Sequence, residues 1–205
     1  MNTNNDIVDS VLYRVMEYLK TNKRGTILTI KDFMNIERLS YTHIRSILVH
    51  LCKRGILIRV SRGVYCYPKY DGNKPIYPPV ITILKAIAHK EGYEICPISE
   101  YAQYLMGIKN TIPLNIVCYN NQRIKTVNLT NGISIKILPS KKAFSSFVGS
   151  FGLRMLLNYI NSNGINNIPI SDKRKLINYF NSLDSNSKMA AKKLPSEIIT
   201  FLELQ

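Results

Sequence analysis

A helix signal at residues 40–55 that runs directly into two strand signals constrains this fold more than any other feature of the sequence. Apolar residues recur at helical spacing in YTHIRSILVHLCKRG, at Ile44, Ile47, Leu48 and Leu51. Ser40 suits the N-cap of this helix, and Gly55 suits its C-terminal end. The β-rich runs ILIRV (56–60) and VYCYP (64–68) follow, joined by Ser61, Arg62 and Gly63. We therefore expect a helix followed at once by a β-hairpin.

Two further helices are predicted before this helix and its hairpin. One covers residues 7–19, where apolar side chains again fall at helical spacing. The second begins near Thr29, with Asp32 three residues later as in a capping box. Three helices and a hairpin within the first 70 residues or so predict a winged helix-turn-helix, whose third helix enters the major groove of DNA.

The third helix and the hairpin supply the candidate DNA contacts. Short polar and cationic side chains on a helix suit base edges and phosphates, and arginines on a wing suit the neighbouring backbone or minor groove. The predicted DNA-binding residues are Tyr41, Thr42, Arg45, Ser46, Arg59, Arg62 and Gly63. Lys53 and Arg54 either add backbone contacts or complement the helix dipole. A structural or protein-binding winged helix is the alternative.

The charge balance predicts a polyanionic partner. The chain of 205 residues carries 28 Lys and Arg against 13 Asp and Glu, a formal net charge of +15. Such an excess attracts nucleic acid or an anionic membrane surface. No apolar run is long enough to cross a bilayer, and MNTNNDIVDS does not resemble a signal peptide. We expect a cytoplasmic protein that does not bind membranes.

The rest of the chain predicts a second domain. Residues 1–70 form the predicted winged helix, and the proline-containing stretch 71–79 is expected to be a linker. Residues 80–205 then contain several helices and three short strand signals separated by Asn-Asn and Asn-Gly. The predicted fold class is α+β, an N-terminal winged helix-turn-helix followed by a mixed C-terminal domain with a small antiparallel sheet. A possible second basic surface lies on this sheet, unless it is only a solvated face: Arg123, Lys125, Lys136, Lys141 and Lys142.

The sequence offers no catalytic signature. It has no phosphate-binding glycine motif and no paired carboxylates at metal-binding spacing. Cys52, Cys66, Cys96 and Cys118 are widely spaced in apolar surroundings, which favours free buried thiols over a zinc site. We expect no enzyme activity, no catalytic residue, no metal and no cofactor.

The order of these features resembles the AbiEi-type antitoxins and related transcriptional regulators of bacterial abortive-infection systems. The resemblance rests on KRGILIRVSRGVYCYPK (53–69), on Ser99 and Ala102, on LMGI (105–108), T-x-P (111–113) and VCY (117–119), and on LPSEI (194–198). It covers most of the chain.

The resemblance implies an antitoxin of a type IV toxin-antitoxin system active in phage defence. Its winged helix would bind inverted repeats in its own promoter and repress the operon by autoregulation. Its C-terminal domain would counter a nucleotidyltransferase toxin without requiring a stable complex. The alternatives are a ligand-responsive transcriptional regulator without a toxin partner and an RNA-binding module, for which Tyr65, Tyr67, Tyr70 and Tyr77 would be a stacking platform.

Overall fold

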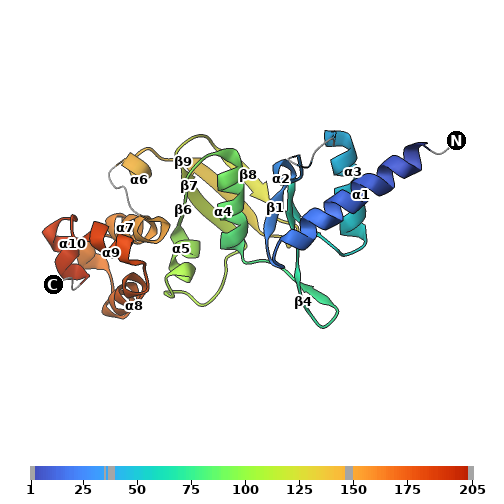
Figure 1. Cartoon of the computed structure of the whole chain (residues 1–205). Coiled ribbons are helices and arrows are strands. Elements are labelled where there is room, and N and C mark those ends of the chain that lie inside the picture. Colours follow the sequence, from blue (N-terminus) through green and yellow to red (C-terminus); the bar gives the residue numbers. More distant parts are fainter. Residues whose placement is uncertain (1–2, 35, 37–39, 146–149, 203–205) are drawn as a thin grey trace. The chain divides into compact units, whose positions relative to one another are not determined.

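The chain forms two compact units in a computed structural model (Figure 1). The structure describes residues 3–34, 36, 40–145 and 150–202, without the side chains of residues 3–10, 142 and 145. The first unit extends to Gly92 and the second begins at Tyr93. Both mix helices with small sheets, so the predicted α+β class is confirmed.

Unit 1 contains the three helices and the hairpin predicted for a winged helix, together with three additional strands and a fourth helix. Its elements are α1 (Thr3–Thr21), β1 (Ile27–Thr29), α2 (Ile30–Met34), α3 (Tyr41–Lys53), β2 (Ile58–Ser61), β3 (Val64–Cys66), β4 (Lys69–Asp71), β5 (Lys74–Ile76) and α4 (Val80–Glu91). The strands β1, β3 and β2 form an antiparallel sheet in that order. The helices followed by the β2–β3 hairpin are compatible with a winged helix.

A single hydrophobic core explains why the three helices of unit 1 pack together. Each helix buries its apolar stripe: Val11, Val15 and Leu19 from α1, Phe33 from α2, and Ile44, Ile47, Leu48 and Leu51 from α3. The Phe33 ring makes an edge-on contact with Tyr18, with ring centroids 5.6 Å apart. Leu28 of β1 and Tyr65 of β3 also lie in this core, so the sheet packs against the helices. Burial of these side chains fixes which face of α3 remains outside.

The stretch 71–79, predicted as a linker, differs from that expectation. Residues 71–76 complete a second hairpin, β4–β5, that extends from the body of unit 1 (Figure 1). Gly72 closes the turn with φ 56°, and Pro75 is tolerated because β5 has no strand on its other side. After this hairpin α4 packs beside β1, so the compact unit continues to Gly92. The prolines concealed the strand signal.

Unit 2 contains a four-stranded sheet and a set of helices. Its elements are β6 (Ile95–Ile98), α5 (Ser99–Leu105), β7 (Asn115–Asn120), β8 (Lys125–Asn128), β9 (Ser134–Pro139), α6 (Lys142–Ser145), α7 (Phe151–Asn163), the 3-10 helix η1 (Ile165–Asn167), α8 (Ile170–Asn181), α9 (Ser185–Ala191) and α10 (Ser196–Phe201). The helix α7 packs against β6 and brings apolar side chains such as Leu153 and Leu156 into a core shared with α8 and α10.

The sheet of unit 2 is mixed, whereas the sequence predicted a small antiparallel one. The strand order is β6-β7-β9-β8, with antiparallel outer pairs and a parallel central pair, β7–β9. The Asn-Asn turn does not close a hairpin. The buried Asn120 side chain donates to the Arg123 carbonyl at 2.8 Å and accepts from the Gln122 amide at 3.4 Å. The chain is thereby redirected, and β8 pairs on the far side of β9.

Candidate nucleic-acid interface

The exposed face of α3 carries the predicted base-contacting residues. The helix starts where predicted, because the Ser40 hydroxyl accepts a hydrogen bond from the His43 amide at 3.3 Å. The four residues predicted on the outward face are all exposed: Tyr41, Thr42, Arg45 and Ser46. Polar and cationic groups therefore line the side of α3 opposite its buried stripe.

The hairpin β2–β3 places the predicted wing residues. Arg59 is exposed and lies opposite Tyr65 in the strand register, while Arg62 is exposed in the turn. Gly63 adopts φ 70°, the left-handed conformation that this short turn requires. The Gly63 carbonyl accepts a hydrogen bond from the Ile30 amide at 3.1 Å. This hydrogen bond connects the turn to the start of α2.

The structure brings α3 and the wing together around one side chain, Tyr65. Burial raises the pKa of the Tyr65 phenol, while the Arg59 and Arg45 guanidinium groups act in the opposite direction. The Tyr41 phenol is a further electrostatic neighbour. Four residues thus define the α3–wing junction: Tyr41, Arg45, Arg59 and Tyr65. Two predicted cations, Arg45 of α3 and Arg59 of the wing, are thus near enough to Tyr65 to act on its pKa.

Two lysines that the sequence analysis missed lie near the wing turn. The Lys90 ammonium group of α4 is 3.1 Å from where a Cβ atom at Gly63 would be. The Lys31 ammonium group of α2 donates to the Lys90 carbonyl at 3.2 Å. Together with Arg62 they make this part of unit 1 strongly cationic. No local pattern links Lys31 to Lys90, so only the fold reveals their proximity.

The tyrosines considered as a stacking platform are engaged inside unit 1. Tyr65 is buried, and Arg24 lies over the rings of Tyr67 and Tyr70, 4.7 and 5.4 Å from their centroids. The Tyr70 hydroxyl donates to the Gly55 carbonyl, and the Tyr77 hydroxyl donates to the Val60 carbonyl at 3.3 Å. These contacts favour a structural role for the four rings over base stacking.

The possible second basic surface does not form one face. In the β8–β9 register Lys136 lies opposite Thr126, whereas Lys125 lies opposite the buried Ile137. Opposite residues share a face and successive residues alternate, so Lys125 and Lys136 lie on opposite faces of the sheet. Lys125 is accordingly half-buried and Lys136 is exposed.

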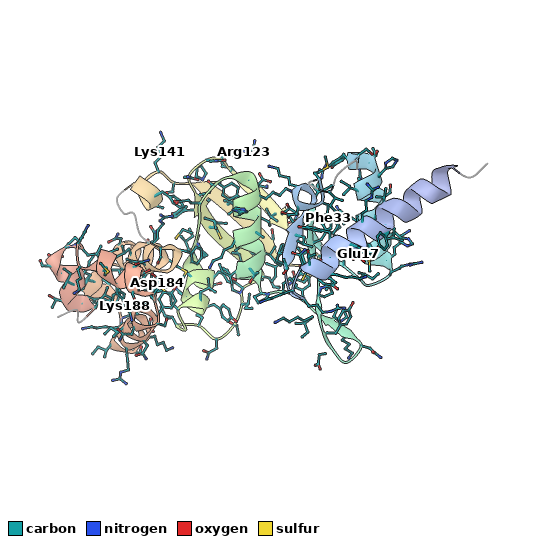
Figure 2. All side chains as sticks on the ribbon, viewed as in Figure 1. Glu17, Phe33, Arg123, Lys141, Asp184 and Lys188 are labelled. Atoms are coloured by element: carbon teal, nitrogen blue, oxygen red, sulfur yellow. The ribbon has the colours of Figure 1, made fainter. Side chains whose placement is uncertain are left out.

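Two other members of that set lie at one end of the sheet. Arg123 precedes β8 and Lys141 follows β9, and both project outward from the ribbon (Figure 2). The side chain of Lys142 lies outside the described residues. The basic residues of unit 2 are therefore distributed over an end and two faces of the sheet, which favours a solvated surface over a single binding face.

The four cysteines are free thiols, as predicted. Cys66, Cys96 and Cys118 are buried and Cys52 is half-buried. Burial raises the pKa of Cys66 and of Cys96 to about 11, so these thiols stay protonated at neutral pH. Within the described part of the chain, no group of His, Cys, Asp or Glu side chains is arranged to hold a metal ion. No described helix is long and apolar enough to span a membrane.

Comparison with known families adds one finding. Residues 14–143 match the model of a family of unknown function, DUF6088. The chain belongs to the DUF6088 family. The matched range includes the C-terminal part of α1, the whole of α3, the wing, and all four strands of the sheet in unit 2. No curated protein matches the sequence. The match therefore extends over most of unit 1 and into the sheet of unit 2, and it assigns a family without assigning an activity.

Proposed function

We propose that this DUF6088 protein is a DNA-binding antitoxin that represses its own toxin-antitoxin operon through unit 1. The observation that supports DNA binding is the α3–wing junction, where Arg45 is exposed on α3, Arg59 is exposed on the wing opposite Tyr65, and both act electrostatically on the Tyr65 phenol. A helix of this width fits the major groove, and adjacent wing cations suit the flanking phosphates. Inverted repeats in the promoter would be the target.

The antitoxin arm of the proposal rests on the AbiEi-like motifs. Several of them fall in unit 2: LMGI at 105–108, T-x-P at 111–113 and VCY at 117–119. By that resemblance, unit 2 counters a nucleotidyltransferase toxin by functional antagonism rather than through an obligatory stable complex. The protein acts in the cytoplasm, in phage defence, and needs no catalytic residue, metal or cofactor of its own.

Two assays test the proposal separately. For DNA binding, fluorescence anisotropy compares Arg45→Ala with Arg174→Ala on a duplex from the upstream region of the gene. Arg174 is an exposed cation on α8 of unit 2, so it controls for the loss of one positive charge. We expect weaker binding only in Arg45→Ala. Equal affinities of the two variants contradict the assignment of α3 as the reading helix.

For toxin antagonism, the chain is co-expressed with a nucleotidyltransferase encoded beside it. Rescue of growth supports the antitoxin function. Binding to the upstream duplex without rescue favours the second candidate, a transcriptional regulator that responds to a ligand. That candidate has one observation in its favour, a cavity in unit 2.

A further inference from the structure

Unit 2 contains a cavity of about 410 Å³ between the β6–α5 segment and α7. This volume lies within the usual range of small-molecule sites, about 300–1,000 Å³. Its walls combine apolar side chains from β6 and α7 with hydroxyl, amide and aromatic groups. The polar and aromatic lining residues are Ser99, Gln103, Tyr119, Asn158, Tyr159, Ser162 and Asn163.

The charges around the cavity cancel. Glu100 and Lys109 both line it, and the Lys109 ammonium group donates to the Glu100 carboxylate. The cavity has no other lining Asp, Glu, Lys or Arg among the described residues. A charged ligand would have to compete with this ion pair, in spite of the net charge of +15 on the whole chain. The cavity therefore favours an uncharged ligand.

Asn158 contributes a hydrogen-bond acceptor to the cavity. Its Nδ2 atom donates to the Arg154 carbonyl at 3.1 Å and contacts the Cys96 sulfur at 3.4 Å. A carboxamide nitrogen has two hydrogens, and these two partners account for both. What Asn158 offers to a ligand is consequently its Oδ1 acceptor. An amine on the ligand is the complementary group.

Aromatic walls favour a flat ring. Tyr119 of β7 and Tyr159 of α7 are both half-buried at the cavity, which Met155 and Ala102 also line. Aromatic faces stack on heterocyclic bases, and a methionine in the wall suits an apolar ring surface.

The backbone at the rim of the cavity is strained. Ser99 has φ 54° at the step from β6 to α5, the one positive value among the described residues other than glycine. Residues in this conformation persist where the surrounding fold holds them, and they concentrate at functional sites. This strain is independent of the composition of the cavity and points to the same location.

We infer that this cavity binds a neutral nucleoside bearing an exocyclic amine, with the ring between Tyr119 and Tyr159 and the amine donating to Asn158 Oδ1. The inference does not depend on DNA binding by unit 1 or on toxin antagonism. A protein that failed both of those tests would still contain the cavity.

Isothermal titration of the full chain with adenosine tests the inference. Ser162 is an exposed cavity residue on α7, so Ser162→Trp fills the site without disturbing the core. Asn161→Trp is the matched control, because Asn161 is exposed on the same helix and does not line the cavity. We expect adenosine binding to weaken by about tenfold or more in Ser162→Trp and to persist in Asn161→Trp. Gln103→Leu keeps the side-chain size and removes one amide, for an expected loss of about 3–10-fold.

Three competitors define the chemistry of the site. Inosine lacks the exocyclic amine and should bind about tenfold more weakly than adenosine; equal binding overturns the role given to Asn158. Adenosine monophosphate binding more tightly than adenosine overturns the neutral ligand, and glucose binding in its place overturns the nucleoside class. No heat of binding with adenosine, or the same affinity in Ser162→Trp, overturns the site itself.

Discussion

The number of exposed cations on α3 and the wing sets the salt dependence that DNA binding should show. Five such side chains lie on this part of unit 1: Arg45, Lys53, Arg54, Arg59 and Arg62. Each phosphate that a cation neutralises contributes about −0.9 to the slope of log affinity against log salt. Five contacts therefore give a slope of about −4.5, or a loss of about 500-fold between about 50 and 200 mM salt.

Single substitutions measure how much each cation contributes to this salt dependence. Arg62→Ala removes a wing cation from the β2–β3 turn, so the slope should become shallower by about 0.9 on every sequence. Arg45→Ala removes a cation from the exposed face of α3, and it should also relax the preference at one or two base pairs by about 1–3 kcal/mol. The side chains of both residues are exposed and lie outside the core, so neither change should unfold unit 1.

Fluorescence anisotropy across a salt series measures both quantities, with Arg174→Ala on α8 as the charge-matched control. The wild-type chain and this control should share one slope. A flat salt response of the wild-type chain refutes the use of α3 and the wing as a phosphate-contacting surface. An unchanged sequence preference in Arg45→Ala refutes the assignment of this side chain to base contacts.

Three other changes test the fold. Phe33→Ala should destabilise unit 1 by about 3–5 kcal/mol in urea unfolding, because it empties a fully buried site, whereas Phe33→Leu should cost less. A fragment of residues 1–92 should show a cooperative thermal transition, and a fragment of residues 1–77, which lacks the packing of α4 on β1, should unfold at a lower temperature. Hydrogen bonds from the side chain and amide of Ser187 lower the pKa of Asp184 below the ordinary value of an aspartate, so this contribution to stability is present at neutral pH and lost on acidification. Asp184→Asn should reduce the change in stability between about pH 5 and pH 2, and an unchanged acid profile would argue against this role.

Local patterns were sufficient to predict the parts of the fold that carry the candidate DNA contacts. The apolar stripe of α3 and the Ser40 cap are determined within one helix, so they predicted both the buried face and the exposed Arg45. The turn at Gly63 was predicted for the same reason, since a short hairpin turn needs a residue that tolerates a positive φ.

Contacts between distant segments could not be predicted in this way. The strand β1 has only three residues and becomes a strand because β3 pairs with it. The parallel β7–β9 pair depends on how Asn120 turns the chain, and the separation of Lys125 from Lys136 depends on the β8–β9 register. The periodicity of a single strand does not determine its register with a neighbouring strand, so neither the β7–β9 nor the β8–β9 pairing could be predicted.

The cavity in unit 2 was also beyond the sequence analysis. Its walls come from β6, α5, β7 and α7, and the central proline of β6 obscured that strand in the sequence. The positive φ of Ser99 has no signal of its own, because serine is an ordinary residue at the start of a helix. Only the assembled unit shows that these segments line one polar cavity.

Binding to the DNA immediately upstream of its own gene tests the central proposal most directly. A gel-shift titration compares that duplex with a scrambled duplex and with single-stranded RNA, each at two salt concentrations. The proposal predicts preferential binding to the upstream duplex, weakening steeply at the higher salt concentration. Equal binding to the scrambled duplex, or a preference for the RNA, would contradict it.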